Sequence, residues 1–167
     1  MSFARVNGAV LHWREDGPRE APAVLFANSL GSDLRIWDDV VAALAKEFRL
    51  VRYDKRGHGL SDVATPFGID DHASDVAALL DHAGIGPCAL VGISMGGMIA
   101  QRFAVRFPNR VRALVLCDTA AKIGTAEIWN ERIRAIRQSG MAAVAETVIQ
   151  RWFAPGFRVR APEAWQG

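Results

Sequence analysis

Long apolar runs and cysteine are both scarce in this sequence, and each shortage narrows what the protein can be. No segment approaches the roughly 18 consecutive apolar residues of a membrane-spanning helix, and the N-terminus lacks the apolar core of a secretory signal. The only cysteines, Cys88 and Cys117, stand beside or within predicted buried strands, where a thiol behaves as a small hydrophobic group. We therefore expect reduced thiols and a cytoplasmic location rather than a disulfide framework.

Blocks of like charge are absent as well, although the chain is slightly basic. Twenty lysines and arginines stand against 18 acidic residues, which gives a formal net charge of +2 and a pI near 8.8. Because these charges are scattered, we expect no nucleic-acid partner. The densest basic cluster is Arg132, Arg134 and Arg137, and for two of the three we favour a solvated helix face. No histidine has metal-ligand spacing to a second ligand, so we expect neither a metal site nor a cofactor.

Strand and helix patterns alternate along the sequence as far as Asp118. With 167 residues, half of them hydrophobic, the chain has the size and apolar content of one globular domain. Residues 10–14 alternate like a half-buried strand, and apolar runs predict further strands at 23–27, 50–53, 88–91 and 111–117. Three- and four-residue spacing predicts helices between them, with Ser32 as N-cap of the first and Asp70 or Asp71 as N-cap of the second. This alternation predicts an α/β fold with a mostly parallel sheet and helices on both faces.

The pattern changes after Asp118. Residues 125–138 and 140–152 form two consecutive amphipathic patterns with no strand between them. Residues 161–164 predict the first turn of a further helix, since proline is favoured at the first helical position. We therefore divide the chain into the N-terminal part of an α/β core at 1–121 and the beginning of a helical cap at 122–167.

One serine stands in a context typical of a nucleophile. Ser94 lies in the segment Gly92-Ile93-Ser94-Met95-Gly96, directly after the apolar run 89–91 and directly before the helical pattern 98–107. Such a strand, tight turn and helix form a nucleophile elbow, in which the serine adopts a strained backbone conformation. Glycines two residues to either side let neighbouring chains pass without meeting a Cβ atom. The five-residue pattern alone is only moderately specific, but the flanking strand and helix strengthen it.

Four segments together give the chain a family resemblance. They are residues 26–31 at the end of the predicted strand 23–27, residues 53–61 at the end of the predicted strand 50–53, the Ser94 elbow, and residues 116–124 leading into the cap. With them the chain resembles the α/β-hydrolases. The last segment, with Trp129 and residues 151–153, more narrowly resembles the 3-oxoadipate enol-lactonases of aromatic-compound degradation. The resemblance extends over essentially all 167 residues but matches only the N-terminal part of that family.

The resemblance implies a serine hydrolase that opens 3-oxoadipate enol-lactone to 3-oxoadipate. Ser94 would be the nucleophile, and the backbone N–H groups of Leu30 and Met95 would form the oxyanion hole. Asn28 and Ser29 would hydrogen-bond a polar substrate or form a turn. In the cap, Trp129 with Lys122 or Arg132 would receive a small lactone that bears a carboxylate, for which a cation is suited.

The chain lacks the remaining members of the catalytic triad. In this fold the acid and then the histidine follow the serine, yet all four histidines precede Ser94: His12, His58, His72 and His82. We expect an Asp and a His on later strands, absent here, and a 167-residue chain that is inactive alone, with residues 111–117 as an exposed sheet edge. For His58 we favour structural support of a loop beside the active site, and for the other three solvated or core-edge roles.

Some assignments stay open at this point. Asp118, at the carboxyl end of a strand, is assigned a hinge role in preference to a catalytic one. A carboxylesterase or perhydrolase of the same fold is an alternative function, as is an inactive, truncated form that only binds ligands. The oligomeric state is not predicted.

Overall fold

The computed structural model describes residues 2–63, 67–154 and 156–161. The chain forms two compact units, Met1–Ile123 and Gly124–Gly167, and this division lies two residues beyond the predicted boundary at 121/122. The helical turn predicted at 161–164 falls almost wholly outside the described residues. Each unit is described separately below.

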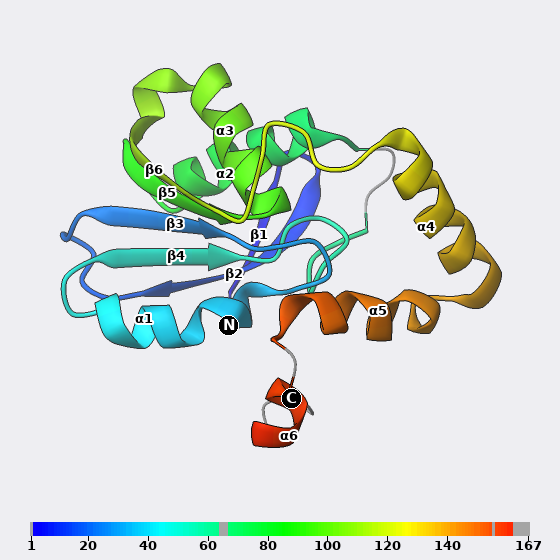
Figure 1. Cartoon of the computed structure of the whole chain (residues 1–167). Helices are drawn as coiled ribbons and strands as arrows, with labels where there is room; N and C mark the ends of the chain where they lie inside the picture. Colours follow the sequence, from blue (N-terminus) through cyan, green and yellow to red (C-terminus); the bar gives the residue numbers. More distant parts are fainter. Residues whose placement is uncertain (1, 64–66, 155, 162–167) are drawn as a thin grey trace. The chain divides into compact units, whose positions relative to one another are not determined.

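The first unit is built on a mostly parallel, six-stranded sheet with the order β1-β2-β4-β3-β5-β6 (Figure 1). Its strands are β1 (Ser2–Val6), β2 (Ala9–Asp16), β3 (Ala23–Ala27), β4 (Arg49–Tyr53), β5 (Cys88–Ile93) and β6 (Val111–Cys117). The β2 strand pairs antiparallel with both β1 and β4. The pairs β3–β4, β3–β5 and β5–β6 are parallel. Their carboxyl ends therefore lie along one edge of the sheet, as predicted for an α/β fold.

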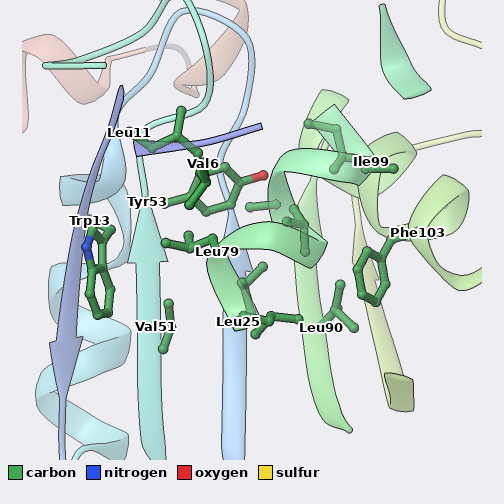
Figure 2. Packing of buried hydrophobic residues seen from close by; sticks show 14 of the residues in the cluster. Val6, Leu11, Trp13, Leu25, Val51, Tyr53, Leu79, Leu90, Ile99 and Phe103 are labelled. Carbon is green, nitrogen blue, oxygen red and sulfur yellow. The ribbon is translucent and has the colours of Figure 1, made fainter. Parts of the chain in front are cut away.

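Helices cover both faces of this sheet. On one face, η1 (Leu34–Trp37) and α1 (Asp38–Leu44) pack Trp37 and Val41 against alternate residues of the strands, among them Val24 and Phe26. On the other face lie α2 (Ile69–His82) and α3 (Met95–Arg106). Figure 2 shows this second core, where Leu79, Ile99 and Phe103 of the helices meet Leu25, Val51 and Leu90 of the strands. The short η2 (Pro108–Arg110) follows α3.

Three local predictions for the first unit were wrong. The β2 strand is not half-buried, because it lies between β1 and β4 and buries the consecutive residues Leu11, His12 and Trp13. The N-cap after β3 is Asp33 rather than Ser32, since the Asp33 side chain accepts a hydrogen bond from the Arg35 N–H.

The helix predicted with Asp70 or Asp71 as its N-cap begins differently too. The N-cap of α2 is Gly68, and the Asp71 carboxylate, three positions into the helix, reaches back to accept the Gly68 N–H at 2.7 Å. An acidic side chain at this third position satisfies a free N–H as well as one at the cap does. The sequence located the start of the helix but not the residue that caps it.

The sixth strand forms an exposed edge, as predicted. The side chains of Leu114, Val115 and Leu116 are 36%, 49% and 44% exposed, and among the described strands β6 pairs only with β5. Its pattern has no polar alternation, which is typical of a strand buried on both faces. The outer edge of β6 therefore has the composition of an interior strand.

The second unit is helical. It contains α4 (Ala126–Ser139), α5 (Ala142–Trp152) and the short α6 (Phe157–Arg160), which was not predicted. The Thr125 hydroxyl caps α4 by accepting the Ile128 N–H, and Gly140, at φ +75°, follows its last residue. No strand separates α4 from α5, in agreement with the prediction. Among the residues described, no helix is both long and apolar enough to cross a lipid bilayer.

Candidate active site

Ser94 occupies the turn between β5 and α3 in a conformation that few side-chain-bearing residues adopt. Its backbone has φ +54° and ψ −118°, which is unfavourable for an L-residue and persists only where the surroundings fix it. Two contacts from β6 and its end do so. The Ser94 N–H donates to the Cys117 carbonyl at 3.0 Å, and the Thr119 hydroxyl donates to the Ser94 carbonyl at 2.6 Å.

The glycines around Ser94 are required by the close approach of neighbouring backbone. A Cβ atom at Gly92 would lie 2.4 Å from the Gly96 carbonyl oxygen, and one at Gly96 would lie 2.0 Å from the Ala27 carbonyl oxygen. Real Cβ atoms do not approach backbone oxygens this closely, so both positions need glycine. The contact of Gly96 with Ala27 also presses the start of α3 against the end of β3. The close packing expected around the elbow is therefore present.

The two predicted oxyanion donors lie on these adjoining elements. Met95 is the first residue of α3, and Leu30 lies in the β3 loop, residues 28–33, which directly follows β3. Neither backbone N–H donates to an acceptor within the described part of the chain. A tetrahedral oxyanion requires free N–H donors of this kind, so both groups remain candidates for that role.

The β3 loop is held by the β4 loop, residues 54–61, which follows β4. Lys55 Nζ donates to the Ser29 carbonyl at 2.6 Å. His58 Nε2 accepts the Gly31 N–H at 3.0 Å, while His58 Nδ1 lies 3.1 Å from the Arg56 carbonyl. Because Nε2 accepts, Nδ1 must bear the proton that it donates, so both ring nitrogens are engaged. Burial lowers the pKa of His58, which favours this neutral form and fits a structural role.

Asn28 also helps to shape the β3 loop. Its side chain is fully buried, and its Nδ2 donates to the Ser32 carbonyl. Asn28 Oδ1 is buried and has no hydrogen-bond partner among the described residues. In this conformation the amide forms the turn, which was one of the two roles expected for Asn28, and its Oδ1 is shielded from an incoming substrate.

Two histidines expected at the surface or core edge are buried instead. His12 Nδ1 lies 2.8 Å from Asp54 Oδ2, and the same carboxylate accepts the N–H groups of Leu34 and Leu60 at 2.8 and 3.0 Å. His72 is 1% exposed, and burial lowers its pKa to about 4. Sequence reasoning missed the pairing of His12 with Asp54, because strand alternation does not reveal which neighbour a buried histidine meets. A cavity of about 610 Å³ opens beside this pair and is not lined by Ser94.

No general base for Ser94 is found among the described residues. Ser94 Oγ has no hydrogen-bond partner there, and His82 stacks edge-on against Trp13 at a centroid distance of 5.8 Å. Asp118 is exposed, at φ +42°, and lies just before the division between the two units. Nor do the described His, Cys, Asp and Glu side chains form a group of three that could hold a metal ion.

The predicted cap residues divide between the units. Trp129 and Arg132, both on α4, lie together, with the Arg132 guanidinium 5.7 Å from the centroid of the Trp129 ring. A Cβ atom at Gly124 would lie 2.9 Å from Trp129 Nε1, so the turn before α4 packs closely on the indole. Lys122 is exposed and belongs to the first unit. The structure thus brings together two of the three substrate-binding residues predicted around the cap, Trp129 and Arg132.

Comparison with known proteins gives this arrangement a context. Residues 22–158 match the family model of the alpha/beta hydrolase fold. The chain is 40% identical to 3-oxoadipate enol-lactonase 2 of Acinetobacter baylyi over 154 residues, which are 92% of this chain and 58% of that protein. The crystal structure of the enol-lactonase from Burkholderia xenovorans LB400 superposes with a TM-score of 0.94 at 42% identity, covering 98% of this chain and 64% of that one.

A more distant match comes from an enzyme described as an esterase. The thermophilic esterase from Thermogutta terrifontis matches with a TM-score of 0.83 at 30% identity over 90% of this chain and 59% of its own. In each of these cases the chain spans less than two thirds of the length of its relative. The resemblance inferred from the four sequence segments is confirmed.

Proposed function

Because this chain belongs to the α/β-hydrolase fold family, we propose that the whole protein is a serine hydrolase that opens a small, carboxylate-bearing enol-lactone. The observation that carries the proposal is the backbone of Ser94, held at φ +54° between β5 and α3. Strain of this kind is maintained at functional sites, where it presents a side chain for reaction. The 40% identity to a 3-oxoadipate enol-lactonase supports the choice of substrate class.

In the proposed reaction Ser94 Oγ attacks the lactone carbonyl as a base removes its proton. The oxyanion that forms accepts hydrogen bonds from the N–H groups of Leu30 and Met95. Collapse of this intermediate breaks the ring C–O bond, and the base returns its proton to the enolate that forms. The resulting enol becomes the ketone and stays attached to the acyl group on Ser94. Water then hydrolyses the acyl-enzyme, so that one lactone and one water give one keto acid. The base would come from outside the described residues, since their four histidines precede Ser94 and none hydrogen-bonds to its Oγ.

A carboxylate on the substrate would be recognised by the cap. The Arg132 guanidinium already lies over the Trp129 ring, so these two side chains offer a cation and an apolar surface side by side. A guanidinium pairs well with a carboxylate. Lys122 is the alternative cation for this role.

A carboxylesterase with uncharged substrates is the second candidate, favoured by the 30% identity to a thermophilic esterase. The two functions differ in whether a substrate carboxylate matters. Comparing kcat/KM of the full-length protein for the enol-lactone and for an uncharged aryl acetate separates them. A preference for the aryl acetate would reject the lactonase assignment.

The nucleophile is tested with Ser94→Ala in the full-length protein. We expect lactone hydrolysis to fall by about a millionfold, as for other triad serines, with folding unchanged. A serine-directed phosphonate should label the wild type on Ser94, as mapped by mass spectrometry. Ser2→Ala, at an exposed position of β1, is the matched control and should keep full activity. Activity surviving in Ser94→Ala, or an unlabelled wild type, would defeat the proposal and favour a binding-only protein.

A further inference from the structure

The carbonyl of Ser29 receives an unusual number of donors. Lys55 Nζ donates to it at 2.6 Å and Ser32 Oγ at 3.1 Å, and the Ser32 N–H donates at 3.4 Å. Lys55 is only 1% exposed, and its side chain extends from the β4 loop to the β3 loop. Nothing in the proposed reaction above uses this lysine.

Burying an ammonium group away from water is unfavourable unless something compensates for it. Here the compensation is incomplete: burial lowers the pKa of Lys55 to about 7, although Asp54 and Asp33 act in the opposite direction. Among the described residues Lys55 forms no ion pair within 4.0 Å, and its one hydrogen bond goes to Ser29. An ammonium and a neutral amine both have N–H donors, so this bond is available in either protonation state.

The bond to Ser29 also determines where Leu30 points. The Ser29 carbonyl and the Leu30 N–H belong to one peptide group, which is planar and whose C=O and N–H point in opposite directions when it is trans. A donor that fixes the carbonyl therefore fixes the N–H on the other side. The following peptide is fixed as well, since the Gly31 N–H donates to His58. Hydrogen bonding to the carbonyl further polarises the amide and strengthens its N–H as a donor.

We propose that Lys55 is a positioning residue for the oxyanion hole: by donating to the Ser29 carbonyl, it aims and polarises the Leu30 N–H toward the oxyanion formed at Ser94. This inference rests on the proposed function, which assigns Leu30 as an oxyanion donor. Lys55 would not touch the substrate. Its contribution would therefore appear in the transition state and not in substrate binding.

The test compares Lys55→Met with Lys46→Met in the full-length protein. Methionine keeps an unbranched chain in the buried space but has no N–H donor, and Lys46 is an exposed lysine that serves as the matched control. In Lys55→Met we expect kcat to fall about 10- to 100-fold, somewhat less than for outright loss of an oxyanion donor. KM should change by less than about threefold, since the loss is confined to the transition state. Affinity for a tetrahedral phosphonate analogue should fall in parallel with kcat/KM.

Ser32→Ala is a second variant on the same carbonyl, and it keeps the test open if Lys55→Met does not fold. It removes the weaker side-chain donor, so we expect a smaller decrease in kcat, again without a matching change in KM. Because Lys55 and Ser32 share one acceptor, the effects of the two substitutions should not add. A kcat within about threefold of the wild type in both variants, or kcat and KM that change together, would overturn the inference.

A signal that does not require activity separates this inference from the proposed function. The ¹⁵N amide resonance of Leu30, assigned with Leu30→Met, should shift in Lys55→Met and stay in place in Lys46→Met. If the wild type neither hydrolyses lactone or ester nor reacts with the phosphonate, the proposed function fails. A shifted Leu30 resonance would still show that the Lys55 hydrogen bond fixes the Ser29–Leu30 peptide group. An unshifted Leu30 resonance overturns the inference whatever the activity.

Discussion

Replacing Gly96 by alanine should loosen the junction on which both predicted oxyanion donors depend. The added Cβ would lie 2.0 Å from the Ala27 carbonyl oxygen, 2.5 Å from its carbon and 2.9 Å from the Asn28 oxygen. Since C···O contacts are comfortable only beyond about 3.3 Å, α3 and the end of β3 must separate by about 1 Å. All three atoms belong to the backbone, so no side-chain rotation relieves the clash.

Two effects of opposite sign determine how Gly96→Ala changes the free energy of unfolding. Alanine favours a helix over glycine by up to about 1 kcal/mol, whereas overpacking of a rigid site costs about 1 to 3 kcal/mol or more. Because the clash involves backbone on both sides, we expect a net loss of about 2 kcal/mol in the free energy of unfolding, measured in urea. The rate of phosphonate labelling at Ser94 should fall about 100-fold, as a 1 Å misplacement typically causes.

Gly86→Ala is the matched control. At Gly86 the added Cβ would meet no heavy atom within 4 Å beyond the adjoining residues, and the backbone is not in the left-handed region. Alanine there should therefore be neutral or stabilise by up to about 1 kcal/mol. The reasoning is refuted if Gly96→Ala unfolds at the same urea concentration as Gly86→Ala and its Ser94 reacts at the wild-type rate. Such a result would mean that the end of β3 yields easily and does not hold the elbow.

Three further changes test other parts of the structure. Asp75 is fully buried and accepts a hydrogen bond from Arg56 Nε at 2.6 Å, so Asp75→Asn should lower the free energy of unfolding by about 3 to 5 kcal/mol. Asp70→Asn, in an exposed pair with Arg102, should leave the urea midpoint nearly unchanged. The Lys55 pKa of about 7, below its usual 10.5, means that the folded chain binds fewer protons than the unfolded chain between these pH values. The free energy of unfolding of the wild type, measured in urea relative to that of Lys55→Met, should therefore increase as the pH rises from 7 toward 10.5. A difference between the two proteins that does not change with pH would exclude a buried, titrating Lys55. Arg132→Gln should raise KM for the enol-lactone about 10-fold and leave that for an aryl acetate unchanged, and equal effects on both would contradict carboxylate recognition.

The sequence by itself determined the features that depend on neighbouring residues. The strand, turn and helix around Ser94 were predictable because apolar periodicity and glycine placement are local signals, and the same holds for the two consecutive helices α4 and α5. The exposed edge of β6 was predictable too, since a strand without polar alternation needs partners on both sides. Local patterns do not fix exact boundaries, which is why Asp33 and Gly68 replaced the predicted N-caps.

Only the tertiary structure decided which distant residues meet. Lys55 and Ser29 are 26 residues apart, and His12 and Asp54 are 42 apart. Lys55 meets Ser29 because the parallel strands β3 and β4 bring the loops that follow them to one edge of the sheet. His12 meets Asp54 because its own strand, β2, lies antiparallel beside β4. In the sequence, Lys55 is one basic residue in a polar loop, and its burial follows from the loops packed around it. The sequence pattern therefore could not predict that Lys55 orients the Leu30 N–H. This proposed role depends on the contact between the two loops in the folded structure.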